Sequence, residues 1–312
     1  MSWSVRDEAG AREFFDPPEA VQAGARRVAQ YLRTSTHAIA FTGAGISTAA
    51  GVPDFRSGMN TKLKTGPGLW AAQADYERRN PVRSAATKGD PTRPRVDLDG
   101  MLRKRPTYTH RALAALVERG YLKTILTQNV DNLHRKSGVP RAHLVELHGN
   151  LQCEVCASCG REYERAFRVG PNLGAGQNRH FSGRRCDAPA CGGYLKDYLV
   201  PFGEDLPKSE TARAYAESDR ADLCLAIGSS LTVTPACDYA GWVSGKVKRR
   251  LEPWKGSAEG RLAIVNIQKT PYDNDADVVL HTFCDDALRM VMEELNLADA
   301  VQPDAALEDE EN

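Results

Sequence analysis

The sequence has no excess of charge of either sign. Its 312 residues include 41 Lys and Arg and 41 Asp and Glu, so the formal net charge is zero. A protein that binds nucleic acid mainly through phosphate contacts needs surplus basic residues, so this balance argues against a general nucleic-acid binder. Residues 246–250 (KVKRR) are a local exception and a candidate for weak chromatin or nucleic-acid association, although such runs are usually solvated surface.

Long apolar runs are also missing. No stretch approaches the roughly 18 apolar residues of a membrane-spanning helix, and residues 1–20 lack the apolar segment of a secretory signal. We therefore expect no membrane association. Eight cysteines without such a signal indicate a reducing compartment, where thiolates bind metal rather than form disulfides.

Four of the eight cysteines form two closely spaced pairs, as a tetrahedral structural zinc site requires. They are Cys156 and Cys159, separated by two residues, and Cys186 and Cys191, separated by four. Cys153 and Cys156 are a competing first pair. Gly160, which suits a tight turn after Cys159, favours the pair Cys156 and Cys159.

Short apolar runs alternate with helical patterns, which predicts an α/β fold. Strands are predicted at 37–41, 123–126, 222–227, 262–265 and 277–280, and helices from Pro18, from a cap at Thr109, and over about 284–297. The first strand runs into the turn Gly43-Ala44-Gly45. The third glycine of a G-x-G-x-x-G motif is replaced by Thr48, so this turn alone is weak evidence for a dinucleotide site.

Four of these strands end in small or polar residues, which core packing does not require. The endings are Gly43 and Gly45; Gln128, Asn129 and Asp131; Gly228, Ser229 and Ser230; and Asn266. In an open parallel sheet, ligands bind outside the carboxyl ends of the strands. We therefore expect the four endings to line one crevice.

The pattern divides the chain into a Rossmann-like open parallel sheet and a small zinc-binding insertion. We predict an N-terminal extension over 1–28, a sheet domain over 29–148 and 200–297, a zinc module over 149–199, and an acidic, disordered tail over 298–312. Residues 57–106, rich in Gly, Pro and Arg, are predicted to form a mobile loop with one short helix near Trp70.

Taken together, several motifs resemble the sirtuin family of NAD-dependent protein-lysine deacylases. They are residues 43–56 (GAGISTAAGVPDFR), 127–134 (TQNVDNLH), 147–150 (LHGN), both cysteine pairs, 228–230 (GSS) and 265–266 (VN). They occur in the family's order across residues 20–297. The stretches 66–70, 154–156 and 284–286 resemble the class IV branch, which contains mammalian nuclear and nucleolar sirtuins. The long loop after Trp70 and the wider second cysteine pair depart from the usual pattern.

The resemblance implies a deacetylase or deacylase that transfers an acyl group from a protein lysine to ADP-ribose and releases nicotinamide. His148 would be the general base, a role that suits an ordinary imidazole pKa of about 6.5, and Asn129 would be the second catalytic residue. NAD and zinc are the implied cofactors. The zinc would be structural, because four thiolates leave no open coordination position.

The same resemblance assigns the NAD site residue by residue. The residues are Gly43, Ala44, Gly45, Ser47, Asp54, Phe55, Arg56, Trp70, Gln128, Asn129, Asp131, Gly228, Ser229, Ser230, Asn266, Ile267, Gln268 and Cys284. The glycines of the first turn would let backbone N–H groups approach the pyrophosphate. Phe55 would shield the ribose of the nicotinamide half, and Arg56 would help to hold the reactive pose.

Acylated protein lysines, including those of histone tails, are the expected substrates, with a nuclear or else cytoplasmic location. Two other functions are considered. One is a protein mono-ADP-ribosyltransferase that uses the same cleft, and the other is a non-catalytic, chromatin-binding zinc module. His148 and the polar strand ends argue against the second, because a binding module has no need of them.

Overall fold

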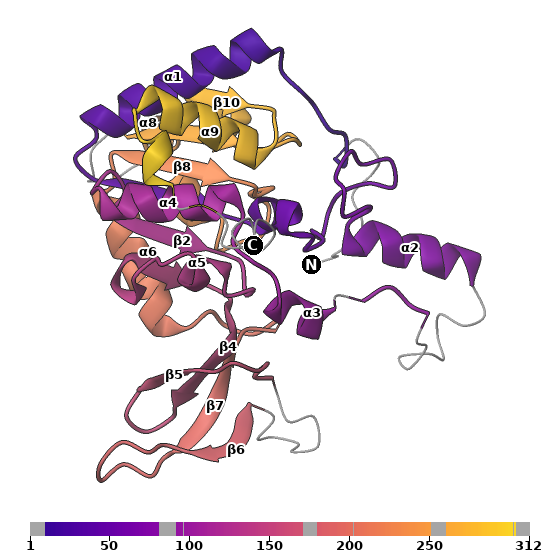
Figure 1. Cartoon of the computed structure of the whole chain (residues 1–312), viewed down its shortest axis with the longest axis vertical. Helices are drawn as coiled ribbons and strands as arrows, with labels where there is room; N and C mark the ends of the chain where they lie inside the picture. Colours follow the sequence, from indigo (N-terminus) through magenta and orange to yellow (C-terminus); the bar gives the residue numbers. More distant parts are fainter. Residues whose placement is uncertain are drawn as a thin grey trace, which may run out of the picture.

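The computed structural model describes residues 10–80, 92–95, 97–170, 180–201, 203–250, 260–301 and 303, with the backbone alone at 248–250. Two sheets organise this part of the chain (Figure 1). The larger sheet has six parallel strands in the order β3-β2-β1-β8-β9-β10. The smaller sheet has four antiparallel strands in the order β5-β4-β7-β6 and projects from one end of the molecule.

The strands are β1 Ala38–Thr42, β2 Thr124–Thr127, β3 Leu144–Glu146, β4 Gly149–Cys156, β5 Glu162–Glu164, β6 Phe181–Arg185, β7 Tyr194–Leu199, β8 Leu223–Ile227, β9 Arg261–Val265 and β10 Val278–Leu280. The order of the larger sheet is the 3-2-1-4-5-6 order of dinucleotide-binding folds. Its topological switch point therefore lies between β1 and β8. The predicted α/β class, with an open parallel sheet and a small inserted module, is confirmed.

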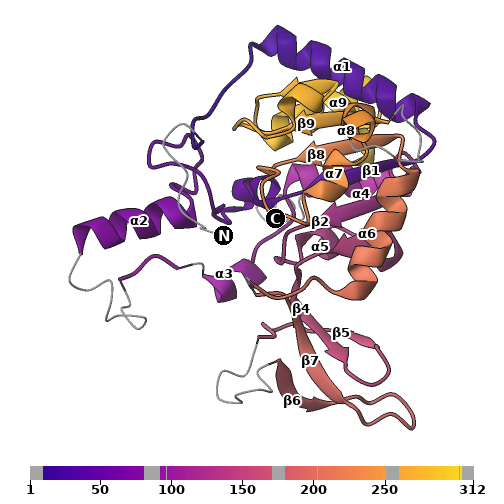
Figure 2. The same ribbon diagram turned by 180° about the vertical axis from the view of Figure 1, so that it is seen from behind.

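Helices cover both faces of the larger sheet (Figures 1 and 2). They are α1 Pro18–Thr34, α2 Leu69–Arg79, α3 Leu98–Leu102, α4 Tyr108–Glu118, α5 Leu133–Lys136, α6 Lys208–Arg220, α7 Asp238–Gly241, α8 Gly245–Arg250 and α9 Cys284–Glu294, with 3-10 turns η1 Ala44–Ala50, η2 Arg141–His143, η4 Asp273–Asp275 and η5 Ala298–Ala300. One apolar core joins α1, α4 and α9 to the sheet, and a second lies on the side of α6 and α7. All five residues of β1 are buried, as expected for a central parallel strand.

The helix predicted from Thr109 is capped two residues earlier. The Thr107 hydroxyl accepts from the N–H of His110, and the His110 ring accepts from the N–H of Thr107, which forms a capping box. Thr109 is instead buried, and its N–H and hydroxyl both donate to the carboxylate of Asp285 at the start of α9. The prediction was wrong because both threonines precede the same apolar pattern, so the sequence does not distinguish them as caps. The carboxylate of Asp285, far away in the sequence, binds Thr109 and leaves Thr107 as the cap.

Three further predictions need correction. The position 28 chosen as a boundary falls inside α1, which packs against α9, so we propose to count α1 with the sheet domain. Residues 57–106 contain two helices, α2 and α3, rather than one. Residues 298–300, predicted as tail, form η5, and the rest of the predicted tail, residues 301 and 303 apart, lies outside the described residues.

The chain passes between the two sheets at His148. β3 ends at Glu146 and β4 begins at Gly149, so two residues connect them. Gly149 has a φ of +80°, and a Cβ there would lie 1.4 Å from the carbonyl oxygen of Tyr198. Only glycine permits this close approach of β4 to β7. In the described part of the chain, no helix is both long enough and apolar enough to cross a bilayer.

Candidate active site

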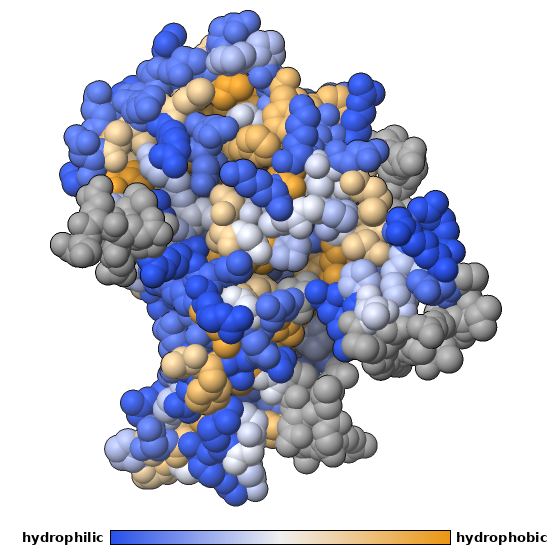
Figure 3. All heavy atoms as spheres, turned by 45° about the vertical axis from the view of Figure 1, so that its right-hand side comes forward, coloured by the Kyte–Doolittle hydropathy of each residue, from blue (hydrophilic) through white to orange (hydrophobic). Residues whose placement is uncertain are grey.

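A cavity of about 1290 Å³ lies at the carboxyl ends of β9, β8, β1 and β2. Figure 3 shows the surface hollowed between the body of the molecule and the segment that carries α2. The cavity exceeds the roughly 300–1,000 Å³ of most small-molecule pockets, which leaves room for a dinucleotide. All four predicted strand endings line it, as does His148. The expected crevice therefore exists at the switch point of the sheet.

The turns after β1 and β8 touch through their backbones. The N–H of Gly45 donates to the carbonyl of Gly228 at 2.8 Å. A Cβ on Gly45 would lie 2.7 Å from the Cα of Gly228, and a Cβ on Gly43 would lie 2.7 Å from the carbonyl oxygen of Gly228. These three glycines are therefore required for the contact, and they leave a floor of backbone without side chains, on which a phosphate can rest.

His148 is held in one orientation at the edge of the cavity. Its Nδ1 lies 3.0 Å from the carbonyl oxygen of Gln128, an atom that can only accept, so Nδ1 carries the proton and Nε2 keeps its lone pair. Burial lowers the pKa of His148 and the hydrogen bond to Gln128 partly opposes that effect. The imidazole is therefore neutral at pH 7, and Nε2 is its basic nitrogen.

Gln128 also joins the ends of three strands. Its N–H donates to the carbonyl of Thr42 at the end of β1, and its side-chain oxygen accepts from the hydroxyl of Ser229 after β8 at 2.9 Å. The hydroxyl of Ser230 pairs with that of Thr232 at 2.9 Å. The position of His148 thus depends on a strand-end network rather than on one contact.

Asn129 and Asp131 form hydrogen bonds with the Gly-rich turn and the 3-10 turn that follows it. The Asn129 amide donates to the carbonyl of Gly43 at 3.0 Å. One carboxylate oxygen of Asp131 accepts from the hydroxyl of Ser47 at 2.6 Å and the other accepts from the N–H of Leu133, as in an Asx-turn. Ser47 is fully buried and is the one predicted NAD residue that does not line the cavity.

The segment after η1 contributes an aromatic and cationic wall. The guanidinium of Arg56 lies 4.5 Å from the centre of the Trp70 ring, and the rings of Phe55 and Trp70 are 5.9 Å apart. Phe55 is 39% exposed, which leaves a ring face for a ligand. Burial raises the pKa of Asp54, whose carboxylate accepts from the N–H and the hydroxyl of Ser57.

The predicted residues at the far end of the cavity follow β9 and begin α9. The Asn266 amide donates to the carbonyl of Gln268 at 2.8 Å. Within the described residues the buried side-chain nitrogen of Gln268 has no partner, which leaves a donor in the cavity wall for a ligand. Burial raises the pKa of Cys284 to about 12, so this thiol is neutral and not a nucleophile.

Sequence reasoning missed an apolar wall beside His148. It consists of Val52, Leu98, Met101, Val130, Leu151 and Leu199, which cluster together and line the cavity. Two of these residues lie on α3, a five-residue helix in a stretch of the chain rich in Gly, Pro and Arg. Five residues are too few to show a helical periodicity, so α3 could not be predicted from the sequence.

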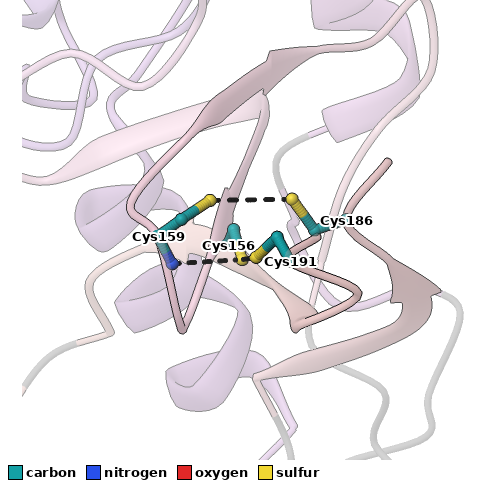
Figure 4. Close-up of side chains that lie close together, drawn as sticks. All are labelled: Cys156, Cys159, Cys186 and Cys191. Atoms are coloured by element: carbon teal, nitrogen blue, oxygen red, sulfur yellow. Dashed lines mark hydrogen bonds between the residues drawn. The ribbon is translucent and has the colours of Figure 1, made fainter. Parts of the chain in front are cut away.

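The smaller sheet brings the four paired cysteines together (Figure 4). Their sulfur atoms all lie within 4.8 Å of one another, and the distances Cys156–Cys191 and Cys159–Cys186 are 3.6 Å. Tetrahedral Zn–S bonds of about 2.3 Å imply S···S distances of about 3.8 Å. The donor set and its spacing fit zinc, and the four thiolates leave no open position for a substrate.

Cys153 does not belong to this cluster. It is fully buried, its thiol donates to the carbonyl of Glu154, and burial raises its pKa to about 12. We expect Cys153→Ala to retain one zinc per chain and Cys186→Ala to lose it, as measured by elemental analysis of the purified variants. Zinc loss in the Cys153 variant with retention in the Cys186 variant would contradict this ligand set.

These features define a nucleotide-binding α/β protein with an inserted zinc module. The model of the Sir2 family matches residues 43–235, which is more than half of the chain. The chain belongs to the Sir2 family.

Curated relatives agree with this assignment. The NAD-dependent protein deacetylase SRT1 of Arabidopsis thaliana is 38% identical over 291 residues, which cover 93% of this chain and 53% of the relative. Sirtuin-7 of Bos taurus is 35% identical over 91% of this chain and 63% of its own length. An NAD-dependent protein deacetylase of Caldivirga maquilingensis is 38% identical over 87% of this chain and 94% of its own. The chain thus spans about half the length of the plant relatives it matches.

Solved structures show the same architecture. A mutant Sir2 homologue in complex with ADP-ribose has a TM-score of 0.59 at 26% identity and covers 89% of this chain and 99% of that one. Sir2 bound to an acetylated peptide has a TM-score of 0.56 at 28% identity and covers 87% and 98%.

Proposed function

We propose that this protein is an NAD-dependent protein-lysine deacetylase or deacylase, which transfers the acyl group to ADP-ribose and releases nicotinamide. The observation that carries the proposal is His148, a neutral imidazole whose Nε2 is the basic nitrogen, at the point where four polar strand ends meet. The relatives named NAD-dependent protein deacetylases support it, as does the structural likeness to Sir2 in complex with a deacetylated peptide and acetyl-ADP-ribose.

Each part of the site would have its own role in the reaction. The contact between the turns of Gly43, Gly45 and Gly228 provides a backbone surface for the pyrophosphate. NAD, when bound, supplies an electrophilic ribose carbon and a leaving group. Nε2 of His148 would accept a proton from a ribose hydroxyl of bound NAD, because the Gln128 carbonyl fixes the other nitrogen as a donor.

The apolar wall and the zinc module have supporting roles. The six apolar residues beside His148 would hold the acyl chain and exclude water from the reacting atoms. The zinc would stabilise the smaller sheet, to which His148 leads directly, and would take no part in the chemistry.

Mass spectrometry of an acetylated histone-tail peptide, incubated with the protein with and without NAD, tests the function. We expect NAD-dependent loss of the acetyl group and formation of O-acetyl-ADP-ribose. Peptides with longer acyl groups, assayed in parallel, would show whether the apolar wall selects chain length. Transfer of ADP-ribose to the peptide or protein, without deacylation, would instead favour the mono-ADP-ribosyltransferase, and absence of both would contradict the proposal.

Nuclear substrates such as histone tails, and weak chromatin association, are part of the same proposal. The similarity to sirtuin-7 over 91% of this chain supports them. The basic run at 246–250 lies on α8, and the ammonium of Lys246 donates to the carbonyl of Ala276, so this residue is engaged in the fold. Fractionation of cells that express the tagged protein would test the nuclear location.

A further inference from the structure

Residues 11–16, which we call the N-terminal strap, precede α1 and run along the rim of the cavity. In Figure 1 this dark segment descends from α1 towards the loop before α2. Glu13 forms an antiparallel bridge with Gln268, and the N–H of Phe14 donates to the carbonyl of Ile267 at 2.7 Å. The strap is therefore paired with the segment after β9, three residues of which (266–268) line the cavity.

The other end of the strap is attached near the start of α9. The N–H of Asp16 donates to the carbonyl of His281 at 2.8 Å, and the carboxylate of Asp16 accepts from the N–H of His281 at 2.7 Å. The ring of Phe15 lies 5.1 Å from that of Phe283 and 4.4 Å from the ammonium of Lys62. These contacts give the strap a defined path across the rim.

The carboxylate of Glu13 connects the strap to the loop of residues 58–65. One oxygen accepts from the hydroxyl of Thr61, and the other accepts from the N–H of Lys62 at 2.9 Å. The backbone of the loop also comes close to the strap, because a Cβ on Gly58 would lie 3.2 Å from the Cβ of Ala11. Besides these bonds to Glu13, the N–H of Gly66 donates to the carbonyl of Leu63 at the end of the loop.

The loop is a wall of the cavity, since residues 62–65 line it. Both ends of the loop are tied back to the fold: Ser57 is bonded to Asp54, and the N–H of Gly68 donates to the carbonyl of Ser57. The middle is held by the hydrogen bonds to Glu13 and by the contact of Lys62 with Phe15. A wall held in place before the ligand arrives costs less ordering entropy on binding.

We propose that Glu13 is a positioning residue for the cofactor, which holds residues 58–65 against the cavity while its own backbone pairs with Gln268 on the opposite rim. The inference rests on the proposed NAD-dependent function. It gives a role to a segment that the sequence indicated only as an extension. Hydrogen bonds to a charged carboxylate are stronger than neutral ones, so loss of this group should release the loop.

Hydrogen exchange of the protein without NAD tests the contact itself. In Glu13→Ala we expect the amides of residues 58–65 to exchange about tenfold faster than in the wild type. Glu19→Ala is the matched control, because Glu19 is exposed in the first turn of α1. A double-mutant cycle with Thr61→Val should show a non-additive effect on exchange, since both changes remove the same hydrogen bond.

NAD binding by calorimetry tests the role of the contact. We expect the Kd for NAD, and its KM, to rise about tenfold in Glu13→Ala, while kcat at saturating NAD and the KM for acetylated peptide stay within about twofold. Exchange rates or NAD affinity equal to those of Glu19→Ala would overturn the proposal. If the wild-type protein binds no NAD, the NAD-dependent function itself is refuted. The exchange data would still test the contact of Glu13 with the loop, because they are measured without NAD.

Discussion

His148→Ala is expected to lower kcat/KM for deacetylation by about 10²–10⁴-fold, the usual contribution of a positioned general base. The loss should fall on kcat and not on NAD affinity, because the backbone turn of Gly43, Gly45 and Gly228 does not depend on this side chain. Initial rates with an acetylated peptide, together with calorimetric titration of NAD, would measure the two effects separately.

The pH profile of the wild type gives an independent readout. Because burial lowers the pKa of His148, the imidazole stays unprotonated below its ordinary pKa of about 6.5. The acid limb of kcat should therefore fall at a pH below 6.5. His143→Ala, at an exposed histidine, is the control and should leave activity unchanged. Activity of His148→Ala within tenfold of the wild type would show that another group takes the proton.

The cavity could be predicted because its residues interrupt strong local patterns. Buried strands can be recognised from their apolar composition. The strands β1, β2, β8 and β9 are all followed by the polar or glycine residues that the sequence indicated. Parallel strands place such endings on one edge, so the crevice followed from the fold class alone.

What the sequence could not predict depends on contacts between distant segments. α6 was not recognised because its sequence, KSETARAYAESDR, is mostly polar, and only Glu210, Ala214 and Ser218 are buried. Ser47 stands inside the resemblance motif but supports Asp131 from behind the cavity. The pairing of Glu13 with Gln268 joins residues at opposite ends of the chain, where no local pattern records it.

Two buried histidines behind the Gly-rich turn give the protein a second pH dependence. The rings of His110 and His134 are 4.9 Å apart, and each has one ring nitrogen without a partner among the described residues. Burial lowers the pKa of His110 to about 3. Burial, and then the neighbouring His110, lower the pKa of His134, with Asp131 acting in the opposite direction. The folded protein therefore keeps both rings neutral at pH 5.

The free energy of unfolding should consequently fall as the solution becomes acidic. Unfolding exposes both imidazoles, whose ordinary pKa is about 6.5, so below that pH the unfolded chain binds protons that the folded chain does not. Stability is lost progressively from pH 6.5 towards pH 3. At pH 5 the loss is about 2 kcal/mol for each histidine, from 1.4 kcal/mol per pH unit over 1.5 units.

Urea unfolding between pH 7.5 and 5, compared between the wild type and His110→Gln, isolates this effect. The variant should be less stable at pH 7.5, because the capping box with Thr107 is altered, yet its stability should depend less on pH, by about 2 kcal/mol over the range. His143→Gln should keep the wild-type slope. Parallel curves for wild type and His110→Gln would mean that His110 protonates in the folded state. The Thr107 hydroxyl, which caps α4 with His110, also donates to the carbonyl of Ile46 in the Gly-rich segment. Protonation of His110 would therefore loosen the turn that NAD is proposed to bind.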